Sequence, residues 1–187
     1  MKLRKKHIIL TLVFVPLIAV LAMLYDHFIE DGNFAIHAPN EVYRSGTLSA
    51  HEWKEVRRKH PFNSVLNLRG ESEGKEWFER EKGAAYRKEI SLITLGISAN
   101  HQPNLAKMEE MVTAMRMAPK PLLIHCKSGS DRTGLALALY SYAIQGKSAE
   151  ESAKQLSLRF GHFPWLTSRT GAMDAAFAAY VAAHPQG

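Results

Sequence analysis

Cysteine is nearly absent from the sequence: Cys126 is the single one in 187 residues. An intrachain disulfide is therefore impossible, and oxidised cross-links take no part in folding. A lone cysteine is usually a small buried apolar residue, so its neighbours decide whether it has a chemical role. Because no second cysteine and no closely spaced histidine pair accompanies it, we expect no metal site. We expect no cofactor either.

Excess charge is also scarce outside the N-terminus. The formal net charge is +6, but four positive charges precede the first acidic residue, Asp26. These four are Lys2, Arg4, Lys5 and Lys6. The other 20 basic residues face 18 acidic ones, which leaves only +2. A body so close to neutral, without a basic stripe interleaved with aromatic residues, argues against nucleic-acid binding.

One long stretch has no charged side chain. It covers residues 8–25 and follows the basic residues 1–7. As a helix, its eighteen residues would span roughly 27 Å, just enough for the hydrocarbon core of a bilayer. A cleaved signal peptide is the alternative, because residues 20–22 form a weak cleavage site, but the apolar run continues beyond them. We expect an uncleaved transmembrane anchor over residues 8–25.

The charges that flank this stretch predict its orientation. Basic residues precede it, and acidic residues follow it at positions 26, 30 and 31. The positive-inside rule then keeps the N-terminus in the cytoplasm and places the rest of the chain on the other side of the membrane.

Residues 31–187 contain no repeat, low-complexity tract or long linker, and we expect them to form one domain. Short β-prone stretches alternate with helical ones, which predicts a three-layer α/β fold. Two capping boxes mark helix starts, at Ser49 with Glu52 and at Ser148 with Glu151. Strands are expected at 34–37, 42–44, 62–68, 86–92 and 121–125. Helices are expected at 49–59, 72–82, 103–117, 135–145, 148–160 and 168–183.

The chemistry is predicted to lie in residues 125–134, HCKSGSDRTG. A buried strand delivers Cys126 at its carboxyl end, Gly129 permits a tight loop, and Arg132 and Thr133 open a helix. In such a strand–loop–helix turn, backbone N–H groups converge on one point and the helix N-terminus adds positive potential. The spacing therefore predicts an anion cradle with a cysteine at its base.

A nucleophilic sulfur suits this cradle. A free thiol has a pKa of about 8.5, and the thiolate is the reactive form. The inward N–H groups and the guanidinium of Arg132 stabilise the thiolate, and the same groups bind phosphoryl oxygens during displacement. Arg132 can chelate two of these oxygens, which a lysine cannot do with the same geometry. Thr133 can donate a hydrogen bond to the departing sulfur in the second step.

Other residues are expected to position the substrate. They are His125, Lys127, Ser128, Gly129, Ser130 and Arg69. His125 should orient the loop rather than transfer a proton. Lys127 can reach an anionic headgroup or lie free on the surface. Arg69 and Arg44, at strand ends, either flank the phosphate or face solvent. Residues 159–169 mix aromatic and basic side chains, and either form one wall of the site or pack under a turn.

The loop sequence HCKSGSDRTG resembles the HCxxGxxR[ST]G signature of the protein tyrosine and dual-specificity phosphatase superfamily. Tyr43–Gly46 (YRSG) and Val65–Arg69 (VLNLR) resemble segments of small dual-specificity phosphatases. The resemblance implies the three-layer fold of these enzymes. It also implies phosphomonoester hydrolysis through a phosphocysteine intermediate, with Cys126 as nucleophile and Arg132 as oxyanion binder.

The general acid departs from the pattern of most members, which place an Asp on a separate loop before the cysteine. Here that loop, residues 95–103, has no Asp or Glu, and no Asp occurs between Asp31 and Asp131. An Asp beside the loop arginine resembles the myotubularin and Sac-type lipid phosphatases, which favours Asp131 as the acid. His101 is a second candidate. Alternatively, Asp131 pairs with a neighbouring cation or caps the helix.

Two substrate classes compete. An anchored domain with an Asp131-type loop favours a membrane lipid phosphate such as phosphatidylglycerophosphate, and places the chain in a bacterial inner membrane with a periplasmic catalytic domain. The alternative is a phosphoprotein, since phosphotyrosine is the superfamily's commonest substrate. A silent phosphate-binding module is disfavoured because Cys126 and Arg132 are both present.

Overall fold

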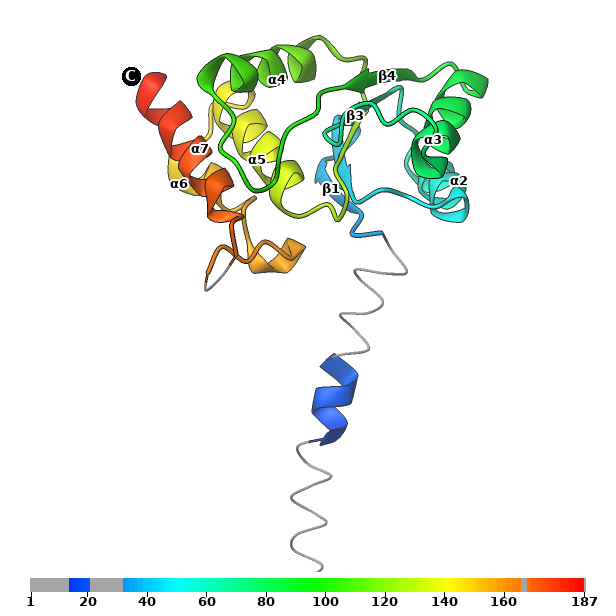
Figure 1. Cartoon of the computed structure of the whole chain (residues 1–187), viewed down its shortest axis with the longest axis horizontal. Coiled ribbons are helices and arrows are strands. Elements are labelled where there is room, and N and C mark those ends of the chain that lie inside the picture. Colours follow the sequence, from blue (N-terminus) through cyan, green and yellow to red (C-terminus); the bar gives the residue numbers. More distant parts are fainter. Residues whose placement is uncertain (1–13, 21–31, 166–167, 187) are drawn as a thin grey trace, which may run out of the picture.

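A five-stranded sheet forms the centre of the domain (Figure 1). The computed structural model describes residues 14–20, 32–165 and 168–186. The strands are β1 (Ala35–Ala38), β2 (Val42–Ser45), β3 (Ser64–Asn67), β4 (Ser91–Thr94) and β5 (Leu122–His125), in the order β1-β2-β5-β3-β4. Only the β1–β2 pair is antiparallel. The strand that precedes the cysteine therefore lies in the middle of the sheet, between β2 and β3.

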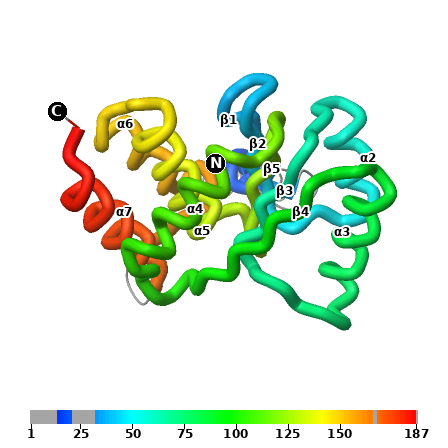
Figure 2. Tube along the Cα trace, turned by 90° about the horizontal axis from the view of Figure 1, so that it is seen from above, coloured from blue at the N-terminus to red at the C-terminus, as the bar shows by residue number. Residues whose placement is uncertain are grey.

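Helices cover both faces of the sheet (Figures 1 and 2). One face carries α2 (Ala50–Lys59) and α3 (Glu76–Arg87). The other carries α4 (Leu105–Met117), α5 (Asp131–Leu139), the π-helix η2 (Tyr140–Ile144), α6 (Ala149–Ala153) and α7 (Gly171–Ala183). A 3-10 turn, η3 (Leu158–Phe160), separates α6 from α7. The predicted α/β class is confirmed.

The strands contribute side chains to two hydrophobic cores, because successive side chains point to opposite faces of a sheet. On β5, Leu123 packs toward α2 and α3, whereas Leu122 and Ile124 pack toward α4, α5 and α7. The neighbouring β3 repeats this alternation with Val65 and Leu66. All four residues of β5 are buried, as the continuous apolar run predicts.

Two helix starts follow the predicted capping boxes. Ser49 caps α2 and Glu52 bonds back to the Ser49 backbone, which completes the capping box. Ser148 likewise accepts a hydrogen bond from the Glu151 N–H at the start of α6.

The helix predicted at 72–82 was wrong at both ends, and the strand predicted at 86–92 began too early. Helix α3 begins at Glu76 and runs through Gly83 to Arg87, and β4 begins only at Ser91. Phe78, Glu81 and Ala85 are buried on one face of α3, so the packing stripe continues past Gly83. Tertiary packing of this face outweighs the cost of a glycine in a helix, which is about 1 kcal/mol.

Three further boundaries differ from prediction. The helix predicted at 135–145 begins earlier, at Asp131, and changes to a π-helix at Tyr140. The helix predicted at 148–160 ends at Ala153, because the following chain crosses closely over α5. A Cβ on Gly134 would lie only 2.9 Å from the Gln155 carbonyl oxygen. The last helix begins at Gly171 rather than at residue 168.

The expected anchor, residues 8–25, lies mostly outside the described residues. Its described part, residues 14–20, is helical. Within the described parts of the chain, no helix has the length and apolar character needed to span a membrane.

Candidate active site

The loop between β5 and α5 turns its carbonyl groups outward. Four consecutive carbonyls, those of residues 126–129, each accept a hydrogen bond from outside the loop. Thr47 binds the first through Oγ1 (3.0 Å) and the second through its N–H (3.1 Å). Asn33 Nδ2 binds the third (2.8 Å) and an Arg44 guanidinium nitrogen the fourth (2.8 Å). Carbonyls held outward leave the amide N–H groups on the inner side of the loop.

Several hydrogen-bond donors at this loop have no protein partner. In the described chain, the amides of residues 127–130 donate no hydrogen bond. Arg132 Nε and Thr133 Oγ1 are buried and also have no partner there. Buried donors are normally satisfied, so a set left free around one loop indicates a site for an acceptor-rich anion.

Gly129 is required by the shape of the loop. Its φ is +75°, a left-handed conformation that favours glycine. A Cβ there would lie 2.7 Å from the backbone nitrogen of Gly46. The β2-to-α2 connection, which begins Ser45-Gly46-Thr47, therefore packs directly against the catalytic loop.

The Arg132 side chain is fixed by two backbone carbonyls. One of its terminal nitrogens donates to the oxygens of Leu68 and Ile97, each at 3.3 Å. Leu68 follows β3 and Ile97 lies on the 95–103 loop, so the structure brings this loop beside the catalytic arginine. The contacts hold the guanidinium in place and leave Nε available, as an oxyanion binder requires.

Arg44 and Arg69, which the sequence left between site and surface, both belong to the site. Arg44 is only 1% exposed and lies 3.4 Å above the ring of Phe160. Burial lowers the pKa of Arg44 to about 9, although the nearby Cys126 charge acts in the opposite direction. Arg69 donates to Thr47 Oγ1 (2.9 Å) and stacks 3.4 Å above the Trp77 ring.

The charge environment of Arg69 places it near the same centre. Burial and then the Arg132 charge lower the pKa of Arg69, while Glu81 and Cys126 act in the opposite sense. Arg44 and Arg69 therefore both lie near Cys126, which is 1% exposed, and Arg132 lies near Arg69.

His125 contacts Glu81, a buried residue that the sequence did not predict as part of the site. Its Nε2 lies 2.8 Å from Glu81 Oε1, in the geometry of an ion pair rather than a directed hydrogen bond. Its Nδ1 lies 3.2 Å from the Cys126 carbonyl oxygen. The other Glu81 oxygen accepts from Asn67 Nδ2 (2.7 Å), and Asn67 binds the Arg69 N–H. A buried acid on α3 thus connects His125 to the end of β3.

Asp131 pairs with a histidine, which agrees with the alternative that it pairs with a cation, although the sequence did not single out this histidine. Its Oδ1 lies 2.7 Å from His162 Nδ1, and His162 Nε2 lies 2.9 Å from Asp174 Oδ2. Burial alone would lower the pKa of His162, but hydrogen bonds and charges from the two carboxylates outweigh it and raise that pKa. No described residue binds Asp131 Oδ2, so this oxygen has no competing partner within the described chain.

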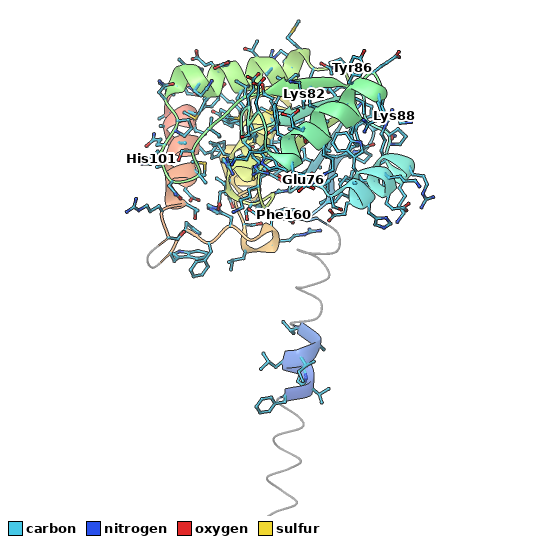
Figure 3. The ribbon with its side chains drawn as sticks, turned by 45° about the vertical axis from the view of Figure 1, so that its right-hand side comes forward. Glu76, Lys82, Tyr86, Lys88, His101 and Phe160 are labelled. Atoms are coloured by element: carbon cyan, nitrogen blue, oxygen red, sulfur yellow. The ribbon has the colours of Figure 1, made fainter. Side chains whose placement is uncertain are left out.

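The remaining predicted residues are more exposed. Lys127 and Ser128 lie open at the loop surface, whereas Ser130 is buried and its Oγ donates to the Phe160 carbonyl (2.8 Å). His101 is exposed, its Nδ1 lies 3.0 Å from Ser98 Oγ, and it lies at the edge of the domain opposite Lys88 (Figure 3). No hydrogen bond within the described chain joins His101 to the catalytic loop.

The segment after η3 presents an aromatic pair. Phe163 and Trp165 are 43% and 54% exposed, with ring centroids 5.2 Å apart. Both side chains are exposed, and they follow His162, which contacts Asp131 at the end of the catalytic loop. Of the two alternatives for this segment, their exposure does not favour packing under a turn. Among the described residues, no group of three or more His, Cys, Asp or Glu side chains is placed to hold a metal ion.

A buried sulfur at the end of a central strand, amides turned toward it and arginines around it define a cysteine-based phosphatase. A family model described as "DSP-PTPase phosphatase fused to NAD+ Kinase" matches residues 15–169, which is most of the sequence. The chain therefore belongs to this family of dual-specificity-type protein tyrosine phosphatases. No curated protein matches the sequence.

Solved structures share the fold at low identity. TpbA from P. aeruginosa in complex with phosphotyrosine is 19% identical, with a TM-score of 0.58 over 80% of this chain and 91% of TpbA. The catalytic core of the PP-IP phosphatase SIW14 from S. cerevisiae is 21% identical, with a TM-score of 0.60 over 76% and 83%. Human DUSP28 is 14% identical, with a TM-score of 0.58 over 80% and 93%.

Proposed function

We propose that this cysteine phosphatase hydrolyses a membrane lipid phosphomonoester, such as phosphatidylglycerophosphate. The observation that carries the proposal is the exposed Phe163–Trp165 pair, which follows the histidine that contacts Asp131. Exposed aromatic side chains next to a polar site suit a substrate whose phosphate is attached to an apolar body. A phosphorylated side chain of a soluble protein does not need such a surface.

Catalysis proceeds in two displacements at phosphorus. The Cys126 thiolate forms a bond to phosphorus while the bond to the lipid oxygen breaks, and Arg132 and the loop amides bind the oxygens that gain charge. The lipid oxygen takes its proton from Asp131 Oδ2. In this step Asp131 starts protonated on Oδ2 while Oδ1 keeps its contact with His162 Nδ1, so the reactive form carries one proton more than the ion pair. Water then attacks the phosphocysteine and gives a proton back to Asp131. The thiolate leaves with a hydrogen bond from Thr133, and inorganic phosphate departs.

The apolar segment at residues 8–25 supports the same substrate. An anchor there holds the domain at the bilayer surface and raises the effective concentration of lipid headgroups. In this proposal the chain is a single-pass protein of a bacterial inner membrane, with the N-terminus cytoplasmic and the catalytic domain periplasmic.

Phosphotyrosine on proteins is the alternative substrate. The observation that favours it is the shared fold with TpbA, whose structure contains phosphotyrosine. The two substrates predict different behaviour for the aromatic pair, because a short phosphopeptide does not depend on an apolar surface at the rim.

The substrate is tested with the purified full chain in detergent micelles. We expect faster turnover of phosphatidylglycerophosphate than of phosphotyrosine peptides, and none with Cys126→Ser. The double variant Phe163→Ala/Trp165→Ala should lose lipid turnover but keep turnover of a small aryl phosphate. The matched control is Tyr86→Ala, an exposed aromatic on α3 (Figure 3).

Lipid analysis of a strain carrying only Cys126→Ser tests the same proposal in the cell. Accumulation of a phospholipid with a terminal phosphate is expected. If the enzyme prefers the phosphotyrosine peptide and the lipid profile is unchanged, the lipid substrate is rejected and the phosphoprotein substrate is supported.

A further inference from the structure

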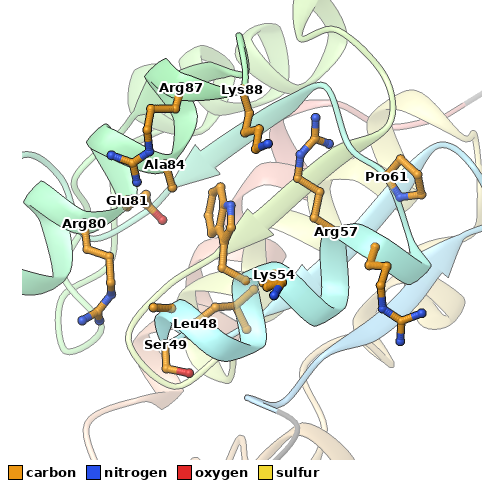
Figure 4. A pocket seen from close by; sticks show the side chains of 13 residues that line it. Leu48, Ser49, Lys54, Arg57, Pro61, Arg80, Glu81, Ala84, Arg87 and Lys88 are labelled. Atoms are coloured by element: carbon orange, nitrogen blue, oxygen red, sulfur yellow. The ribbon is translucent and has the colours of Figure 1, made fainter.

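A cavity of about 460 Å³ lies between α2 and α3 and is separate from the catalytic loop (Figure 4). Its size falls within the range of small-molecule sites, about 300–1,000 Å³. None of its lining residues belongs to the loop of residues 125–133. The phosphatase reaction described above makes no use of it.

Basic side chains surround this cavity. Six cations line it, and they are Lys54, Arg57, Arg58, Arg80, Arg87 and Lys88. Figure 4 shows Arg57 of α2 with Arg87 and Lys88, at the end of α3, around the opening. The only acid in the lining is Glu81, and its two oxygens already contact His125 and Asn67. Positive charge is therefore concentrated locally in a domain whose overall charge is small.

Most of these cations have no acidic partner. Arg58 pairs with Glu55 (2.8 Å) and Arg80 with Glu76 (3.1 Å). The other four form no ion pair with any described residue. Like charges held close together repel one another, so an arrangement of this kind favours a bound anion.

The interior of the cavity is apolar and contains a free donor. Leu48, Trp53, Pro61 and Ala84 contribute apolar surface. Trp53 packs edge-on against Phe62, at 5.2 Å between ring centroids. Its indole nitrogen is buried and has no acceptor among the described residues, although a buried indole N–H usually finds one. The ligand that completes this cavity needs both an acceptor and an apolar body.

We propose that the cavity between α2 and α3 is a second binding site, which takes an anionic amphiphile of the alkyl phosphate type. The phosphate contacts the unpaired cations, an oxygen accepts from the Trp53 indole, and the alkyl part covers Leu48 and Ala84. Glu81, in the wall, also contacts His125, so the ligand lies one side chain away from the catalytic loop. The proposal does not depend on which substrate the catalytic site hydrolyses.

The three tryptophans of the chain allow the two sites to be observed separately. Trp53 lines the cavity, whereas Trp77 stacks on Arg69 at the catalytic site. In ¹⁵N-labelled protein, each indole N–H gives one NMR signal, and Trp53→Phe assigns the first. Decyl phosphate below its micelle concentration is the probe. We expect a saturable shift of the Trp53 signal that persists when vanadate occupies the catalytic site.

Charge variants locate the anion. Lys54→Gln/Arg87→Gln removes one unpaired cation from each helix and should weaken decyl phosphate binding by about tenfold or more. The control, Lys107→Gln/Lys154→Gln, removes two positive charges elsewhere and should leave it unchanged. Short-chain phosphatidic acid, a membrane lipid analogue, and inorganic phosphate distinguish the sources of the headgroup.

Three outcomes would overturn the proposal: no shift of Trp53, equal weakening by both double variants, or binding of inorganic phosphate as tight as that of decyl phosphate. Tighter binding of phosphatidic acid than of decyl phosphate identifies a lipid as the natural occupant, and the reverse order identifies a soluble alkyl phosphate. Both orders support the site.

Discussion

Arg44, Arg69 and Arg132 lie at the site of Cys126. Each of these arginines is held by different contacts. Arg44 is buried and holds the Gly129 carbonyl. Arg69 is fixed by Thr47 and Trp77. Arg132 is held by two carbonyls and keeps Nε free. The first two arginines organise the loop and add positive potential, and the third is placed to bind the transferring phosphoryl group.

Asp131→Asn tests the proton donor. Turnover of an alkyl phosphate, a poor leaving group, should fall by about 10²–10⁴-fold. Turnover of an aryl phosphate with an acidic phenol should fall much less, because its leaving group needs little protonation. The measurement is kcat on both substrates.

The matched control for this prediction is His101→Asn, on the 95–103 loop, which should change neither rate. Equal losses on both substrates for Asp131→Asn would mean that Asp131 has a structural role. A selective loss for His101→Asn would identify that histidine as the acid.

His162 links protein stability to pH. Its folded-state pKa is raised above 6.5 by two carboxylates, so the stabilising charge is fully present below about pH 6.5 and is lost as pH rises through the folded pKa. The free energy of unfolding lost in His162→Asn should therefore be larger at pH 5.5 than at pH 9. Urea denaturation at both pH values measures it, and a difference independent of pH contradicts the ion-pair assignment.

The sequence predicted the parts of the site that are local in the chain. Cys126, Gly129 and Arg132 lie within seven residues, and the strand and helix beside them fix their geometry. Glu81 and His162 were missed because their partners lie 44 and 31 residues away and nothing in their own neighbourhood marks them. A buried acid on a helix face was the only available signal for Glu81.

At the level of elements, capping signals were more reliable than helix breakers. Ser49 with Glu52 marked the start of α2 correctly because the capping contacts lie within one turn. The helix predicted to end at residue 82 instead continues through Gly83, because Phe78, Glu81 and Ala85 form one buried face that extends past it. The short α6 ended early for the same kind of reason, the close approach of Gln155 to Gly134.

Ser49→Ala tests the capping box. It removes the acceptor for the Glu52 N–H and should lower the free energy of unfolding by about 1 kcal/mol. Turnover of aryl phosphate should remain unchanged, since Ser49 does not touch the catalytic loop. Chemical denaturation measures the loss. Ser72→Ala, outside any helix, should stay within about 0.5 kcal/mol, and a similar loss there would contradict the capping assignment.

At the level of the whole molecule, β5 joins the two cores to the catalytic loop. Its side chains alternate between the α2–α3 core and the α4–α7 core, and its last residue, His125, precedes the nucleophile. The position of Cys126 is therefore fixed from both faces of the sheet. This explains why the apolar run of β5, although short, predicted the location of the site.

Leu123→Ala tests how much the core between the sheet and helices α2 and α3 contributes to stability. Leu123 is 1% exposed, and its truncation should lower the free energy of unfolding by about 2–5 kcal/mol through lost burial and a residual cavity. Leu158→Ala, at a position 58% exposed, is the control and should change stability little. Comparable losses for the two variants in thermal denaturation would contradict the two-core description.

The central claim is that Cys126 accepts the phosphoryl group. Rapid mixing with an aryl phosphate, acid quench and peptide mapping by mass spectrometry test it most directly. We expect one added phosphoryl group on the peptide that contains Cys126, formed before the steady state and absent in Cys126→Ser. Rapid product release with no phosphorylated peptide, or a phosphoryl group on another residue, would contradict it.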